Sequence, residues 1–225
     1  MALDMNDSYA NSADVHIALA KIQAYASKPN RTLIGLTGIP GSGKSTLSDY
    51  LLNHFIQQQN AQVICLSMDG FHLSKAQLNA LPNADEAFAR RGAPWTFDST
   101  AFIERVTLIK QGYQQDDILW PSFDHAIGDP IEDDLTIKKE TKVILIEGLY
   151  LLHQNDGWQA SQTLFDEHWF LDIPVEVAIE RLAKRHMKAW NFSHEQAMDR
   201  INQSDGLNAK LVATYKDQAD WLLRV

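Results

Sequence analysis

The sequence predicts an α/β fold with a mainly parallel sheet. Short apolar segments alternate along the chain with segments of helical periodicity, an alternation typical of parallel strands covered by helices. A glycine-rich turn joins the first apolar segment to the helix that follows it. The 225 residues, 45% hydrophobic and 22% charged, suffice for one domain of this class with its own core. We therefore predict a single domain over residues 1–225.

Strands are predicted where short apolar runs are bounded by Gly, Pro or Asp. In chain order these runs are 32–38, 62–71, 117–124, 142–152, 168–173 and 220–225. The second run meets a polar break at Asp69 and Gly70, and we expect Pro121 to interrupt the third.

Helices are predicted where apolar residues recur three or four positions apart. They cover 14–27 (capped by Ser12 or Asp14), 44–59, 98–111, 174–188 and two shorter stretches within 193–218. The segment 72–97 is expected to be irregular, because Pro82, Gly92 and Pro94 punctuate it.

The charge balance excludes some classes of partner. Twenty Lys and Arg against 29 Asp and Glu give a formal net charge of −9, which disfavours binding to nucleic acid and to anionic membranes.

No apolar run approaches the ~20 residues of a membrane span, and the N-terminal residues lack the pattern of a secretory signal. The single cysteine, Cys65, cannot form an internal disulfide. We expect a cytoplasmic protein without a nucleic-acid or membrane partner, and a homodimer stays open.

The strongest motif is GIPGSGKST, which matches G-x-x-x-x-G-K-[ST] between a predicted strand and a predicted helix. Backbone N–H groups of such a loop bind the β-phosphate of a nucleotide, its Lys reaches the β- and γ-phosphates, and its Ser can ligate Mg²⁺. A chance match over this chain has a probability of about 1%. We predict a P-loop NTPase three-layer sandwich that binds a nucleoside triphosphate and Mg²⁺, with a loop formed by Gly38, Gly41, Ser42, Gly43, Lys44, Ser45 and Thr46.

The loop predicts a nucleotide but no reaction. The guanine-reading N-K-x-D pattern and the L-S-G-G-Q signature of transport ATPases are absent, and 225 residues leave little room for a motor. A small kinase is the main hypothesis. An ATP-binding regulatory protein and a plain NTP hydrolase stay open as alternatives.

Two carboxylates follow predicted strands. The carboxyl ends of parallel strands line the ligand crevice, so Asp69 could orient or deprotonate an acceptor hydroxyl; a turn aspartate is the alternative, since Asp-Gly is a common turn pair. Glu147 ends the most apolar strand, where a carboxylate suits Mg²⁺ together with Ser45.

The segment 181–188 holds four Lys or Arg residues and no acid. We predict a helical lid over about 181–205, in which Arg181 and Arg185 stabilise the charge of the transferred phosphate. A solvated helix face is an equally good interpretation of this charge run.

Four segments after the loop carry a family resemblance. They are 68–71 (MDGF), 91–98 (RGAPWTFD), 121–125 (PSFDH) and 146–148 (IEG). In this order, over residues 30–225, they resemble the phosphoribulokinase, uridine kinase and bacterial pantothenate kinase family. The short length and the segment 204–211 look most like short bacterial members described as sugar- or nucleoside-kinase-like.

The resemblance implies an ATP-dependent kinase for a small molecule with a hydroxyl group. It implies that Asp69 is the catalytic aspartate, and that Lys44, Arg181 and Arg185 assist transfer. It also implies acceptor-side contacts from Asp69, Arg91, Phe123 and His125. Uridine kinases usually have Asp-Ser-Phe-Tyr where this chain has Asp-Gly-Phe-His, and pantothenate kinases are longer, so a sugar, a nucleoside, pantothenate and glycerate all stay open as acceptors.

Overall fold

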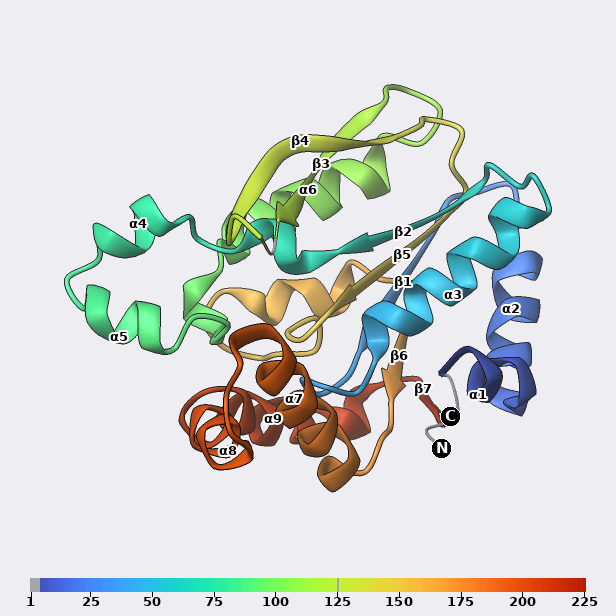
Figure 1. Cartoon of the computed structure of the whole chain (residues 1–225). Helices are drawn as coiled ribbons and strands as arrows, with labels where there is room; N and C mark the ends of the chain where they lie inside the picture. Colours follow the sequence, from blue (N-terminus) through green and yellow to red (C-terminus); the bar gives the residue numbers. More distant parts are fainter. Residues whose placement is uncertain (1–4, 125) are drawn as a thin grey trace.

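The computed structural model describes residues 5–124 and 126–225 and contains a five-stranded parallel sheet (Figure 1). The strand order is β2-β5-β1-β6-β7. The strands are β1 Thr32–Thr37, β2 Val63–Ser67, β5 Val143–Gly148, β6 Glu167–Leu171 and β7 Trp221–Leu223. Because all of them run parallel, their carboxyl ends meet at one edge of the sheet, where ligand crevices form.

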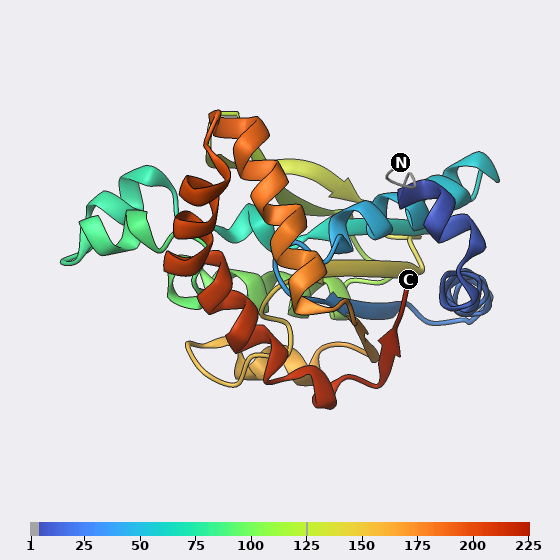
Figure 2. The same ribbon diagram turned by 60° about the horizontal axis from the view of Figure 1, so that its bottom comes forward.

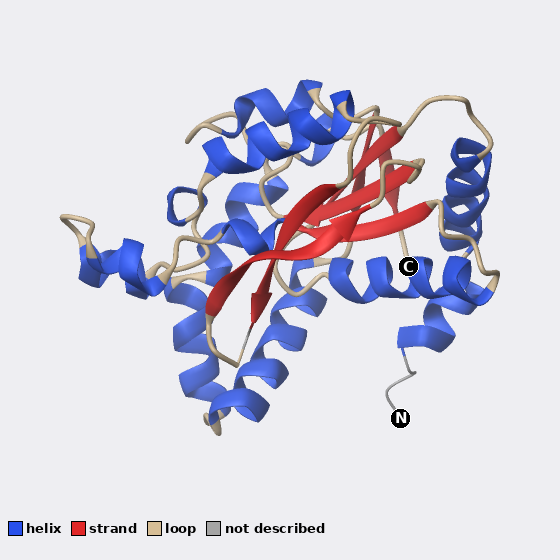
Figure 3. Ribbon diagram, turned by 90° about the horizontal axis from the view of Figure 1, so that it is seen from above, coloured by secondary structure: helices blue, strands red, loops and turns tan. Residues whose placement is uncertain are grey.

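Helices cover both faces of the sheet, which confirms the predicted three-layer α/β fold (Figure 3). One face packs against α1 Met5–Asn11, α2 Ala13–Ala26 and α3 Lys44–Gln57. The other face packs against α6 Ser99–Gln111, α9 Asp205–Ala213 and the 3-10 helix Trp158–Thr163. Ser12 caps α2 and Asp98 caps α6 through side-chain oxygens, as their sequence positions suggest.

Side chains along β5 alternate between the two faces of the sheet, and this alternation determines the face on which Glu147 lies. Val143 and Leu145 are buried with α3 on one face of the sheet, and Ile144 and Ile146 are buried on the other. Successive side chains of a strand point to opposite faces. Glu147 therefore lies on the α3 face, beside the start of that helix.

The second helical layer continues into α7 Val175–Trp190 and α8 His194–Gln203 (Figure 2). These two helices pack together through Leu182, Ala183, Ala197 and Ile201. They span the region predicted as a helical lid. Within the described chain, no helix has both the length and the apolar character that a membrane span requires.

The prediction for 117–124 is half right. This segment forms β3 Ile118–Asp124, and Pro121 causes only a register shift between Trp120 and Ser122 rather than a break. Its antiparallel partner, β4 Asp129–Ile137, was not predicted, because its acidic sequence lacks an apolar run. We call β3 and β4 together the hairpin. It hydrogen-bonds to the main sheet through the Trp120 indole, which donates to the Ser67 carbonyl at 2.9 Å.

Two other boundaries differ from the predictions. The strand predicted for 62–71 ends at Ser67, and Met68–Phe71 form a 3-10 helix in which a Cβ on Gly70 would lie 2.2 Å from the Pro121 carbonyl oxygen. The segment 72–97 is not wholly irregular. It contains α4 Lys75–Asn79 and α5 Ala84–Ala89, which project from the body of the molecule, with a capping box at Ser74 (Figure 1).

Candidate active site

The phosphate loop connects the end of β1 to the start of α3, as the motif predicts. Its turn depends on glycines at positive φ, with Gly41 at 79° and Gly43 at 95°. A Cβ on Gly41 would lie 2.3 Å from the carbonyl oxygen of Ala178 in α7, so the loop packs tightly against this helix. A Cβ on Gly38 would lie 2.8 Å from the Ser42 hydroxyl, so this glycine leaves space for the buried serine.

A pocket of about 220 Å³ lies between this loop and α7. We call it the phosphate pocket; it is lined by Gly41, Gly43, Lys44, Ser45, Thr46, Arg181, Leu182 and Arg185. Three of these described residues are Lys or Arg and none is acidic. The start of α3 adds the positive end of a helix dipole, so the pocket suits a polyphosphate.

Arg181 and Tyr9 hold the loop from outside. The Arg181 guanidinium donates to the Ser42 carbonyl oxygen at 2.8 Å, and the Tyr9 hydroxyl donates to the Gly43 carbonyl oxygen at 3.2 Å. Burial raises the pKa of Tyr9 to about 12, which keeps its hydroxyl protonated as a donor. Tyr9 was not predicted, since nothing in its local sequence indicates this contact.

Glu147 lies directly beside the loop. The Ser45 hydroxyl donates to its carboxylate at 3.1 Å. Burial raises the pKa of Glu147, Lys44 opposes this rise, and Asp69 adds to it. A serine hydroxyl and a carboxylate are hard oxygen donors, and this donor set fits Mg²⁺.

A second pocket of about 280 Å³ shares Ser45 with the first, and Glu147 lies in its wall. We call it the acceptor pocket. It lies between α3, β2 and the hairpin, and Asp69 is one of its lining residues. The Asp69 backbone N–H donates to the Ser67 hydroxyl at 3.2 Å, which fixes the first turn of the 3-10 helix after β2. The structure thus brings Asp69, Glu147, Ser45 and Lys44 together.

Comparisons with known proteins agree with this geometry. A sequence profile of the phosphoribulokinase / uridine kinase family matches residues 33–225. The chain belongs to that family. Its members include phosphate-loop kinases, and the resemblance inferred from the motifs is confirmed.

A curated relative from Schizosaccharomyces pombe, named "Putative uridine kinase C227.14", is 38% identical over 184 residues, which is 81% of this chain and 78% of the relative. A solved structure from Silicibacter sp. TM1040, described as a "putative fructose transport system kinase", is 31% identical, with a TM-score of 0.78 over 91% of this chain and 97% of that chain. A third, YFH7 from Saccharomyces cerevisiae, has a TM-score of 0.76 at 22% identity over 99% of both chains and supports the fold.

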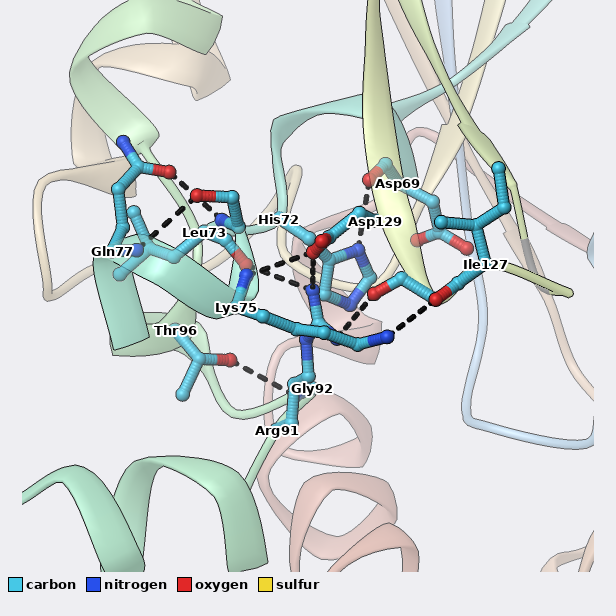
Figure 4. Close-up of polar contacts among 12 residues, drawn as sticks. Asp69, His72, Leu73, Lys75, Gln77, Arg91, Gly92, Thr96, Ile127 and Asp129 are labelled. Carbon is cyan, nitrogen blue, oxygen red and sulfur yellow. Dashed lines mark hydrogen bonds and ion pairs between the residues drawn. The ribbon is translucent and has the colours of Figure 1, made fainter. Parts of the chain in front are cut away.

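Of the other residues predicted for the family's acceptor side, Arg91 and Phe123 lie close to each other. Phe123 lines the acceptor pocket, whereas His125 lies outside the described residues. Arg91 donates to the carbonyl oxygens of Gly128 at 2.5 Å and Leu73 at 2.9 Å (Figure 4). Its guanidinium also lies 5.4 Å from the centre of the Phe123 ring. That Arg91 contacts the acceptor stays a prediction.

Three further lining residues of the acceptor pocket were missed at the sequence level. Ser48 and Asp49 come from α3, and Cys65 comes from β2. A signal for Asp49 exists: it lies four residues after Ser45, and positions four apart share one face of a helix. The pocket beside this helix face is formed by the hairpin, and nothing in the sequence indicates that the hairpin packs there.

Proposed function

We propose that this protein transfers the γ-phosphate of ATP to a hydroxyl group of a small metabolite, with Mg²⁺ as cofactor. The observation that carries this proposal is the meeting of two pockets at Ser45, whose hydroxyl donates to Glu147 in the wall of the second pocket. One pocket is cationic and suits a polyphosphate, and the other contains Asp69. A plain hydrolase or a regulatory nucleotide-binding protein would not need the second pocket.

The proposed reaction forms a bond between the acceptor oxygen and the γ-phosphorus and breaks the bond between this phosphorus and the oxygen that bridges to the β-phosphate. The Asp69 carboxylate orients the acceptor hydroxyl and accepts its proton. Lys44 and the N–H groups of the loop bind the β- and γ-phosphates. Arg185 stabilises the charge on the transferred group from the α7 side, and Arg181 supports the loop through its hydrogen bond to the Ser42 carbonyl oxygen.

Ser45 and Glu147 are the residues that would hold Mg²⁺. When bound there, Mg²⁺ neutralises charge on the β- and γ-phosphate oxygens. The position of Glu147 supports this role, because its carboxylate lines the acceptor pocket and accepts a hydrogen bond from Ser45, which lines both pockets.

The test is ADP release measured across a panel of hydroxyl-containing metabolites. We expect a large, acceptor-dependent rise, together with a phosphorylated product. Asp69→Asn should lower kcat by at least ~10²-fold while leaving ATP affinity near that of the wild type. Asp116→Asn, at an exposed acid outside both pockets, is the matched control. Steady ADP release that no acceptor stimulates would contradict the proposal and favour a hydrolase.

A further inference from the structure

The acceptor pocket is strongly acidic. Asp49, Asp69 and Glu147 line it from three different elements, and none of the described residues in its wall is Lys or Arg. Mg²⁺ at Ser45 and Glu147 would offset charge at one end only, leaving Asp49 and Asp69 to face the acceptor. An acceptor with a carboxylate or phosphate group would therefore be repelled.

Nearby cations are already engaged elsewhere. Arg91 binds two carbonyl oxygens and the Asp129 carboxylate, the latter at 3.1 Å (Figure 4). Lys75 donates from Nζ to the Ile127 carbonyl oxygen at 2.5 Å and from its backbone N–H to Asp129 at 2.8 Å. Lys75 fastens the loop at the end of the hairpin to the start of α4, and Arg91 joins the same loop to Leu73. Neither lines the acceptor pocket, so neither is placed to pair with an anionic group there.

Asp49 is the acidic residue of the pocket that phosphate transfer does not use. It lies one turn after Ser45 on α3, next to the buried Ser48. Within residues 5–124 and 126–225, no hydrogen bond or ion pair engages its carboxylate. Partial desolvation raises the pKa of this carboxyl.

The rest of the wall suits a molecule with several hydroxyl groups. Ser48, Ser67 and Ser122 supply hydroxyls that both donate and accept, while Phe123 and Leu135 supply apolar surface. A carboxylate accepts hydrogen bonds only, so it selects donors such as sugar hydroxyls. Few polar groups placed against an apolar wall are the usual means of orienting a small ligand.

We infer that the acceptor is an uncharged polyhydroxylated molecule, such as a free sugar, a sugar alcohol or the ribose of a nucleoside, and that Asp49 binds its hydroxyl groups. This inference rests on the proposed kinase function and narrows it. It excludes glycerate, pantothenate and sugar phosphates as acceptors. Asp49 is a specificity-determining residue, distinct from Asp69, which faces the reacting hydroxyl.

The first test compares acceptors that differ only in charge. ADP release and phosphorylated product are measured for glucose against gluconate, ribitol against ribonate, glycerol against glycerate, and uridine against uridine monophosphate. We expect activity with neutral members, and kcat/KM at least ~10-fold lower for their anionic partners. Preference for the anionic members would overturn the inference while leaving the kinase function intact. A panel without any stimulated acceptor would overturn both.

The second test changes Asp49. Asp49→Asn should raise the KM of the neutral acceptor by about 10-fold, the effect of one charge-assisted hydrogen bond, with kcat within ~3-fold and the KM for ATP unchanged. Asp49→Lys should shift preference towards the anionic member of a pair. Because Asp49 is exposed on the helix surface, both variants should fold, and circular dichroism checks this.

Asp116→Asn serves again as the matched control, because it removes an exposed carboxylate outside the pocket. It should leave the acceptor KM and the charge preference unchanged. The contrary outcome is that Asp49→Asn also leaves the acceptor KM and the charge preference unchanged in a protein that phosphorylates neutral acceptors. In that case Asp49 does not bind the acceptor, and the inference fails.

Discussion

Arg181 of α7 and Ser42 of the phosphate loop are joined by a hydrogen bond of 2.8 Å, in which the guanidinium donates to the carbonyl oxygen. The lid helix therefore supports the back of the loop as well as facing the phosphate pocket. Arg185 lies one turn further along α7, is exposed, and lines the same pocket. The two arginines of the predicted lid thus occupy different positions relative to the loop.

This difference predicts distinct kinetic effects. Arg181→Gln should mainly raise the KM for ATP, because the loop loses a support. Arg185→Gln should mainly lower kcat, by on the order of 10²-fold, because charge on the transferred group loses a partner. Lys184→Gln is the control, since that side chain is 71% exposed and pairs with Glu180. Equal effects of all three variants on kcat and KM would contradict the assignment.

A second prediction concerns the buried carboxylate of Glu147. Its pKa is raised by burial, so the charged form lowers the stability of the fold at neutral pH. Glu147→Gln should raise Tm at pH 8 by on the order of 3 °C in magnesium-free buffer. The gain should shrink as pH falls through the raised pKa, because the wild-type carboxyl then becomes protonated and neutral.

The same variant should lose magnesium-dependent activity, since a neutral amide binds Mg²⁺ poorly. Thermal scans from pH 5 to 8, with activity titrated against Mg²⁺, measure both effects. A lower Tm for Glu147→Gln at pH 8 would show that Lys44 more than offsets the buried charge.

A third prediction uses the single cysteine. Burial raises the pKa of Cys65 to about 12, so its thiolate fraction at neutral pH is about 10³-fold below that of an ordinary thiol. Reaction with a disulfide reagent should be correspondingly slow in the native protein and fast in urea. Rapid native labelling would mean that the partly exposed Cys65, which lines the acceptor pocket, ionises more readily than this raised pKa allows.

A fourth prediction concerns how the end of the hairpin is held. Arg91→Met removes hydrogen bonds to two carbonyl oxygens and to Asp129, and should lower the free energy of unfolding by about 2 kcal/mol. We expect a raised KM for the acceptor, since Phe123 beside Arg91 lines that pocket, and an unchanged KM for ATP.

The control for this variant is Arg105→Met. Arg105 also binds the hairpin, at the Leu119 carbonyl oxygen and Asp133, but it contacts neither pocket. Hydrogen exchange should speed up in the hairpin of both variants, while only Arg91→Met changes the acceptor KM. An equal rise of the acceptor KM in the two variants would indicate that the stability of the hairpin, and not the contact of Arg91 with Phe123, determines acceptor binding.

The parts of the molecule that sequence patterns predicted are those governed by local rules. The phosphate loop has a fixed spacing, and β1 and β5 are short apolar runs buried on both faces. β4 escaped prediction because most of it is exposed and acidic, so its pairing with β3 depends on a tertiary partner. The helices α4 and α5 are too short to show helical periodicity, and the neighbouring Pro and Gly residues indicated an irregular segment instead.

The same distinction holds in the site. Lys44, Ser45 and Glu147 were predicted because a motif or a strand end placed them, and the structure brings them together. Asp49 was missed because its importance depends on the hairpin facing α3. Asp49 lines the acceptor pocket only because α3 and the hairpin, which are distant in sequence, meet in the fold.

The hairpin shares no strand pairing with the main sheet among the described residues, and its Trp120 hydrogen-bonds to the end of β2. In the proposed function, Asp69 and Glu147 follow strands of the main sheet, while Pro121, Ser122, Phe123 and Leu135 of the hairpin form part of the wall of the acceptor pocket. Mutations in the hairpin can therefore accumulate without changing how the phosphate loop binds a nucleotide. One ancestral phosphate-transfer core could in this way have diverged towards many different acceptors.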